Sequence, residues 1–228
     1  MEDLGRDFAS GSGVVDASRD QKGINAKDIT LGASVNATAD LDGKGESLGN
    51  DTLRNYGIGD TWSIAAWVRP AKLSVRSKPR YVINLNGKSS TETYDEISLT
   101  IDSGGHFAIE VSDIFGRARA LSAPAGIVPP TKKGDVWYHV AAVKNANRSL
   151  TLYVNGIQVA SSVVGVPSQA DLPRAMRIGG RVKSSSGRYF KGGIGSVGIW
   201  RTALRPSEVS ALMAGGIHGA LRPLLISR

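Results

Sequence analysis

The sequence predicts an all-β protein, a sandwich of two antiparallel sheets in a jelly-roll arrangement, with one short helix near the C-terminal end. Three observations lead to this fold class. Short segments of alternating apolar and polar residues recur along most of the 228 residues. Turn-forming pairs such as Asn155-Gly156 separate them. Glycine is abundant at 28 residues, whereas charged residues make up only 21%, which favours a turn-rich β protein.

Eight segments carry the strand pattern clearly. They are residues 61–69, 80–85, 96–102, 106–112, 136–144, 149–155, 157–161 and 190–200. Weaker strand patterns occur at residues 14–16, 29–39 and 46–48, in a polar background rich in glycine and aspartate. Turns are expected between strands at Asn86-Gly87, Ser103–Gly105, Asn145–Asn147 and Asn155-Gly156.

Two of these strands are apolar on both faces, at residues 62–68 and 136–143. Such strands are typical of the centre of a sheet whose outer side is covered by loops or by another subunit. Trp67 and Trp137 lie on them, and both are candidate glycan-binding residues that could stack on a sugar. We favour core packing for these two tryptophans, and we expect His139 to be a packed or hydrogen-bonded histidine.

The only helix predicted covers residues 206–213. Pro206 suits its first turn, and Gly215-Gly216 ends it. Residues 221–226 can form a last strand. No proline- or serine-rich linker divides the chain, so we expect one domain over residues 1–228, with an extended arm at 1–13 and a tail at 217–228.

Composition excludes several kinds of protein. The absence of cysteine excludes disulfides and cysteine-bound metals. The first residues lack the apolar segment of a signal peptide, and no run reaches the roughly 18 apolar residues of a membrane span. The net charge of +8 predicts a basic surface for an acidic partner, without the motifs of a nucleic-acid-binding protein. The candidate residues for this surface are Arg76, Lys78, Arg80, Lys132, Lys133, Arg181, Lys183 and Arg188.

Three longer segments carry a family pattern through their sequence and through their order and spacing along the chain. They read TWSIAAWVRP, WYHVAAVKNANRSLTLYVNGIQVAS and MRIGGR…FKGGIGSVGIWRTALRPSEV. Together, over about residues 61–212, they resemble the laminin-G-like domains of the concanavalin A-like lectin/glucanase superfamily. This resemblance implies a jelly roll of two antiparallel sheets. Where the family usually reads I-D-E-V, this chain has Ile194-Gly195-Ser196-Val197, so a ligand site that depends on those acidic residues is not carried over.

Candidate catalytic residues are few. Glycosidases of this fold use two facing carboxylates, usually in the pattern E-x-D-x-x-E, which this chain lacks. Glu92, Asp95 and Glu96 have the wrong spacing, and Glu110 with Asp113 lacks a third member. The three histidines are far apart in sequence, and no G-x-S-x-G motif accompanies them. We therefore expect no enzymatic activity.

Calcium is the remaining cofactor to consider, because lectins of the family that the sequence resembles bind Ca²⁺ through loop oxygens. Two groups of residues could supply such oxygens: Asp40, Asp42, Asn50 and Asp51, or Asp95, Glu96 and Asp102. Neither group forms a recognised ligand sequence, and aspartate is common in turns. We therefore expect no cofactor, with calcium as the alternative.

The sequence favours a non-catalytic structural or adhesion module, most simply a decoration or appendage subunit on a bacteriophage virion. It starts with a Met and has no cysteine, and we expect no catalytic or anchoring domain to be attached to it. Such a subunit would be made in the host cytoplasm and held in an assembly, where it binds an acidic capsid surface and host glycans. The alternatives are a free-standing carbohydrate-binding module, either cytoplasmic or exported by a non-classical route, and a glycoside hydrolase.

Overall fold

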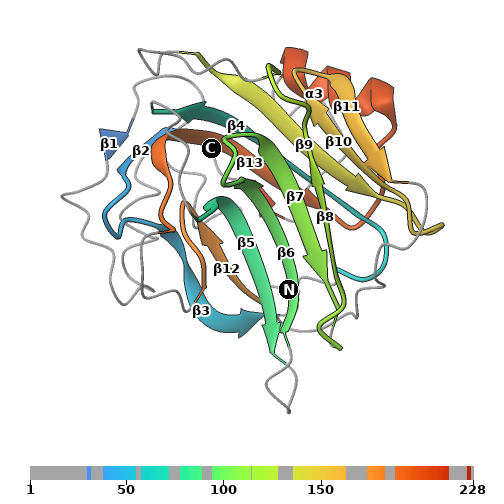
Figure 1. Cartoon of the computed structure of the whole chain (residues 1–228), viewed down its shortest axis with the longest axis horizontal. Helices are drawn as coiled ribbons and strands as arrows, with labels where there is room; N and C mark the ends of the chain where they lie inside the picture. Colours follow the sequence, from blue (N-terminus) through green and yellow to red (C-terminus); the bar gives the residue numbers. More distant parts are fainter. Residues whose placement is uncertain are drawn as a thin grey trace.

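The computed structural model of the chain describes residues 30–31, 38–54, 58–71, 78–88, 94–113, 115–127, 136–162, 174–182, 188–215 and 225–226. Within these residues, two antiparallel sheets pack on each other and one helix lies outside them (Figure 1). The eight-stranded sheet runs in the order β1 (Thr30–Leu31), β2 (Thr38–Asp42), β13 (Lys191–Trp200), β4 (Trp62–Pro70), β9 (Tyr138–Lys144), β10 (Leu150–Val154) and β11 (Ile157–Ser162), and β14 (Leu225–Ile226) pairs with β13. The six-stranded sheet runs in the order β3 (Leu48–Arg54), β12 (Arg174–Ile178), β5 (Arg80–Lys88), β6 (Tyr94–Ile101), β7 (Phe107–Ser112) and β8 (Ala118–Ser122).

The hydrophobic core lies between the two sheets. Ile64 and Val140 contribute to it from the eight-stranded sheet, and Ile83 and Leu99 contribute from the six-stranded sheet. All four side chains are fully buried, and each burial stabilises the fold by about 1.5–3 kcal/mol. Because β13 lies between β2 and β4, a strand from late in the sequence occupies the centre of the larger sheet. The predicted jelly-roll sandwich is confirmed.

The helix α3 (Pro206–Gly215) covers part of the outer face of the eight-stranded sheet. Its Val209 and Leu212 pack with Trp200 against Ala65 of β4 and Ala141 of β9. This contact explains why β4 and β9 are apolar on both faces. The cover over this part of the sheet is a helix of the same chain, whereas the sequence suggested loops or another subunit.

The glycines of β13 allow neighbouring atoms to approach closely. A Cβ atom on Gly192 would lie 2.1 Å from the carbonyl oxygen of Arg69, and one on Gly198 would lie 2.4 Å from the ring of Trp200. The pairing of β13 with β4 shifts register between Gly195 and Gly198, where Ser196 has a positive φ of 48°. The glycines are therefore required for packing at these positions.

Some predicted boundaries are wrong. Asn86-Gly87 is not a turn, because both residues pair with β6 inside the longer strand β5. The sequence pattern also missed β8 and β12, which are five-residue strands without a clear alternation of apolar residues. The strand predicted at 14–16 and the arm at 1–13 lie outside the described residues. Of the predicted tail, the structure describes only β14.

Candidate functional site

Polar side chains gather on the outer face of the six-stranded sheet. The strand register places Asn84 of β5 opposite Ser98 of β6, and Ser98 opposite Glu110 of β7. Residues before and after them in each strand point into the core, so this row of three faces outward. Glu96 lies on the same side of β6 as Ser98. The polar face is defined here as Tyr81, Asn84, Glu96, Ser98, Glu110, Arg181 and Arg188.

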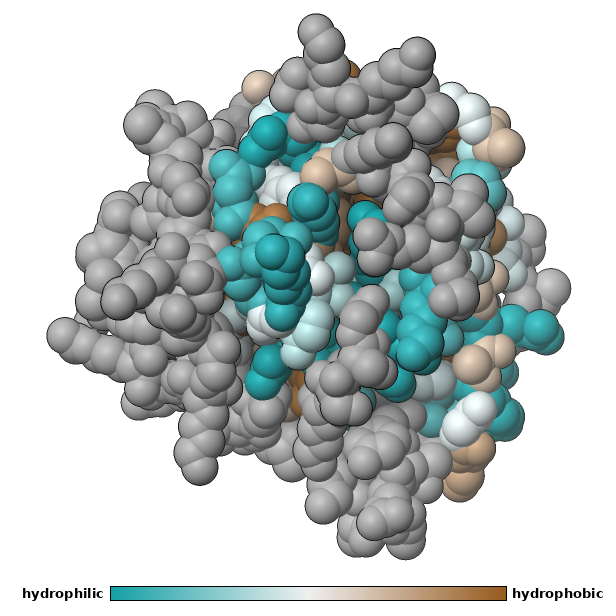
Figure 2. All heavy atoms as spheres, turned by 60° about the vertical axis from the view of Figure 1, so that its left-hand side comes forward, coloured by the Kyte–Doolittle hydropathy of each residue, from teal (hydrophilic) through white to brown (hydrophobic). Residues whose placement is uncertain are grey.

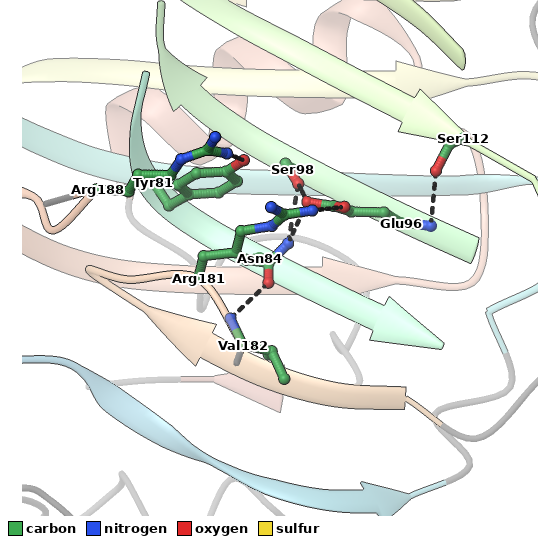
Figure 3. Close-up of polar contacts among 8 residues, drawn as sticks. All are labelled: Tyr81, Asn84, Glu96, Ser98, Ser112, Arg181, Val182 and Arg188. Carbon is green, nitrogen blue, oxygen red and sulfur yellow. Dashed lines mark hydrogen bonds and ion pairs between the residues drawn. The ribbon is translucent and has the colours of Figure 1, made fainter. Parts of the chain in front are cut away.

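Glu96 is the centre of a hydrogen-bond network on the polar face (Figure 3). Its carboxylate accepts hydrogen bonds from Arg181 Nη2 at 2.8 Å, Asn84 Nδ2 at 2.9 Å and Ser98 Oγ at 2.8 Å. Asn84 Oδ1 in turn accepts a hydrogen bond from the backbone N–H of Val182 at 2.8 Å. Asn84 and Ser98 are fully buried. The network therefore fixes the segment after β12 across β5 and β6.

Tyr81 positions two guanidinium groups on the polar face. Arg188 Nη1 donates a hydrogen bond to the Tyr81 hydroxyl at 3.2 Å, and the Arg181 guanidinium carbon lies 5.7 Å from the centroid of the Tyr81 ring. Both groups lie on the same side of β5 (Figure 3). Burial lowers the pKa of Arg181, but its hydrogen bond to Glu96 and the Glu96 charge outweigh burial and raise the pKa overall, so Arg181 stays charged.

Two polar groups of this face lack a partner among the described residues. The half-buried carboxylate of Glu110 makes no hydrogen bond or ion pair there, and Arg181 Nε is a buried donor without an acceptor. Burial, followed by the negative charge of Glu96, raises the pKa of Glu110. Small side chains flank Glu110, with Ala108 on β7 and Ala120 opposite on β8. The Glu110 carboxylate is therefore an unused acceptor that an incoming ligand can reach, whereas Arg181 Nε lies below the surface.

The two candidate glycan-binding tryptophans lie on the other sheet. Trp67 of β4 contacts the ring of His139 of β9 with centroids 5.5 Å apart, and Arg69 lies over the ring of Trp137 at 5.4 Å. Both tryptophans are half-buried on the outer face of the eight-stranded sheet, and neither belongs to the buried core that the sequence favoured for them. The structure thus brings Trp67 and Trp137 near each other and separates them from the polar face.

His139 is packed, as the sequence indicated. Its side chain is 2% exposed, and its Nδ1 has no hydrogen-bond partner among the described residues. Burial lowers its pKa from 6.5 to about 4, so the imidazole is neutral at pH 7.

The residues of the expected basic surface are distributed unevenly. The structure brings Arg181 and Arg188 together on the polar face, and Lys78 is exposed elsewhere. Arg80, the first residue of β5, is only 7% exposed, so it contributes little accessible surface to such a partner site. Arg76, Lys132, Lys133 and Lys183 lie outside the described residues. Figure 2 turns the side that carries β2 and β3 toward the reader, and the residues coloured there are mostly hydrophilic.

The candidate calcium ligands have other contacts where their side chains are described. Asp40 forms an ion pair with Arg69, and Asp42 Oδ1 accepts the backbone N–H of Lys44 at 2.6 Å. Asp102 accepts a hydrogen bond from Ser122 at 2.9 Å. The side chains of Asn50, Asp51 and Asp95 lie outside the described residues. Within the described part of the chain, no three acidic or histidine side chains converge on a metal position.

A family model for the concanavalin A-like lectin/glucanases superfamily matches residues 42–210, which is most of the chain. The chain belongs to the concanavalin A-like lectin/glucanase superfamily. Membership in this superfamily confirms the resemblance of the three sequence segments. No curated protein sequence matches the chain. No helix in the described ranges combines the length and apolar character needed to cross a membrane.

Solved structures of this fold include sugar-binding domains. Domain 4 of the extracellular arabinanase AbnA from Geobacillus stearothermophilus, in complex with arabinotriose, has 20% identity and a TM-score of 0.57 over 81% of both chains. The CBM40 domain of a Ruminococcus gnavus sialidase, bound to α2,3-sialyllactose, has 17% identity and a TM-score of 0.53 over 69% of this chain and 84% of that one. The ligand-binding domain of botulinum neurotoxin serotype D, in complex with N-acetylneuraminic acid, has 17% identity and a TM-score of 0.65 over 86% of this chain. The present chain spans only 46% of the length of that neurotoxin chain.

Proposed function

We propose that the protein is a carbohydrate-binding domain that holds a glycan on the polar face. The observation that carries this proposal is the half-buried Glu110 carboxylate, which has no partner among the described residues and shares this face with two arginines held in place. A sugar hydroxyl both donates and accepts hydrogen bonds, so one hydroxyl can donate to Glu110 while another accepts from the half-buried guanidinium of Arg188. Hydrogen bonds to charged groups contribute about 1.5–3 kcal/mol each. Two such bonds suit a weak, reversible binding site.

The surroundings of Glu110 support this proposal. Ala120, which lies opposite Glu110 on β8, is small and exposed, so it leaves one side of the carboxylate open to a ligand. The network around Glu96 holds Arg181 in place before a ligand arrives, which lowers the entropy cost of binding. Domains of similar fold bind arabinotriose and sialyllactose, so the fold is suited to glycans.

A binding role fits these carboxylates better than glycoside hydrolysis. Hydrolysis requires one carboxyl group as acid and a second that is free to attack or to activate water. Glu96 already accepts hydrogen bonds from three side chains, which leaves Glu110 as the only unengaged carboxylate of the polar face. The virion role expected from the sequence stays a prediction, since no feature of the described residues favours it.

The test is a glycan array followed by calorimetric titration of the glycans that bind. We expect Glu110→Ala to weaken binding at least about tenfold, because a charged hydrogen bond of about 1.5–3 kcal/mol is lost. Glu208→Ala, on α3 beyond the other sheet, is the matched control and should bind like the unchanged protein. The circular dichroism spectrum of each variant checks its fold.

Two outcomes would overturn this proposal. The first is the absence of binding to any glycan on the array by the folded protein. The second is a glycan whose binding is lost in Trp67→Ala or Trp137→Ala but retained in Glu110→Ala, which would place the site on the eight-stranded sheet. Incubation of the bound glycan with the protein, followed by mass spectrometry, should show no cleavage.

A further inference from the structure

We infer that the glycan carries an anionic group, a carboxylate or a sulfate, and that this group binds to Arg181 and Arg188 while sugar hydroxyls reach Glu110. This inference rests on the proposed glycan-binding function and adds the chemical class of the ligand. It follows from the distribution of charge over the polar face, from the donors left unused there, and from the rigid placement of both arginines.

The charges on the polar face are separated. Glu96 forms an ion pair with Arg181 at 2.8 Å, so these two residues offset each other. Arg188 donates to the neutral hydroxyl of Tyr81 and forms no ion pair with any carboxylate among the described residues. Its positive charge is therefore free to attract a ligand.

Glu110 does not compensate for Arg188. The two residues are close enough for the Arg188 charge to lower the pKa of Glu110, although burial and Glu96 raise it more strongly. They form no ion pair with each other in the described structure. Arg188 is attached through Tyr81 to β5, whereas Glu110 lies on β7, two strand spacings or about 10 Å across the sheet. The polar face thus has a positive end over β5 and a negative end over β7.

The positive end offers the donors that an anion needs. Arg181 uses Nη2 for Glu96 and Arg188 uses Nη1 for Tyr81, so other N–H groups of the two guanidiniums have no acceptor among the described residues. A guanidinium group presents planar N–H donors that match the oxygens of a carboxylate or a sulfate. An anionic group would therefore accept hydrogen bonds from these N–H groups and pair with the charge of Arg188. A neutral hydroxyl could accept a hydrogen bond there but could not compensate the charge.

Both arginines are held in place before a ligand binds. The ring of Tyr81 lies beside Arg181, its hydroxyl bonds to Arg188, and its side chain is only 1% exposed. Figure 3 shows the two guanidinium groups on the same side of the sheet, next to this ring. The overall charge of +8 adds a long-range attraction for anionic ligands that salt would screen.

The experiment uses an array of matched pairs. Uronate- and sialate-bearing glycans are printed beside their methyl esters, and sulfated glycans are printed beside their desulfated forms. We expect the anionic member of a pair to bind at least about tenfold more tightly than its neutral partner. Raising NaCl from about 0.05 M to about 0.5 M should reduce this preference. Comparison of the ester and sulfate pairs distinguishes a carboxylate from a sulfate.

Variants assign the preference to its residues. Arg188→Gln should bring the affinities for the anionic and the neutral glycan of a pair to within about threefold of each other. Arg188→Lys keeps the charge but loses the planar donors, so its preference should lie between those of Arg188→Gln and the unchanged protein. Arg205→Gln is the control, because Arg205 is 77% exposed at the start of α3 and pairs with Glu208. The Arg205→Gln variant should keep the full preference for the anionic glycan. Thermal melts establish that each variant is folded.

The outcomes separate this inference from the proposed function. Equal binding of anionic and neutral partners would refute the anionic ligand while leaving the carbohydrate-binding function intact. An anionic preference that persists in Arg188→Gln would refute the assignment to this face. Absence of binding to every glycan would refute the proposed function itself.

Discussion

Replacing Asn84 with alanine should destabilise the protein by about 3–5 kcal/mol. Asn84 is fully buried and makes hydrogen bonds to Glu96, Ser98 and the N–H of Val182. The hydrogen bonds to Glu96 and Ser98 each contribute a net of about 0.5–1.5 kcal/mol, and the buried Val182 N–H left without an acceptor costs a further ~1–3 kcal/mol. Val182 itself is only 4% exposed, so water cannot easily replace the lost acceptor.

Urea unfolding, followed by tryptophan fluorescence, measures this change in the free energy of unfolding. Asn86→Ala is the matched control, since Asn86 lies two residues along the same face of β5 and its side chain makes no hydrogen bond among the described residues. The control should lose less than about 1 kcal/mol. Equal losses for the two variants would show that the network around Glu96 does not hold the segment after β12.

Three further predictions concern single residues. Gly198→Ala should lower the stability by about 1–3 kcal/mol in thermal unfolding, because its Cβ would lie 2.4 Å from the ring of Trp200; an unchanged melting temperature would contradict the packing of β13. His139 has a pKa lowered to about 4 in the folded protein, so its unfolded form binds the extra proton and stability falls as the pH drops from about 6.5 toward 4, by up to about 3 kcal/mol. His139→Gln should remove this part of the pH dependence in urea unfolding. The pH dependence contributed by Glu110 has the opposite sign. Its pKa is raised in the folded protein, so stability falls as the pH rises from the ordinary glutamate pKa through the folded pKa. Glu110→Gln should therefore gain most stability over the unchanged protein near neutral pH, and a constant difference between pH 4 and 7 would contradict the pKa shift.

Much of the fold could be predicted because alternation and turn residues are local signals. The strand at 61–69 and the helix at 206–213 correspond to β4 and α3 within two residues at each end. In contrast, β12 has no such signal, since two of its five residues are arginines. It becomes a strand because β3 and β5 lie on either side of it, and these contacts join residues far apart in the sequence.

The polar face was harder to predict than the fold. Polar residues at Glu96, Ser98 and Glu110 alternate with apolar ones, so their outward direction was visible in the sequence. Their assembly into one row depends on the register between β6 and β7, which a motif within a single strand does not contain. Arg181 was predicted as part of a basic surface, but its partner Glu96 lies 85 positions away and only the fold brings them together.

The most direct test of glycan binding at the polar face is a nuclear magnetic resonance titration of the ¹⁵N-labelled protein with the tightest glycan from the array. We predict that the amide signals of Ser98, Glu110 and Arg181 shift with increasing glycan. The indole signals of Trp67 and Trp137 should stay in place, because these residues lie on the opposite sheet. Shifts confined to the two indoles and their neighbours, with the polar face unchanged, would contradict the proposed site.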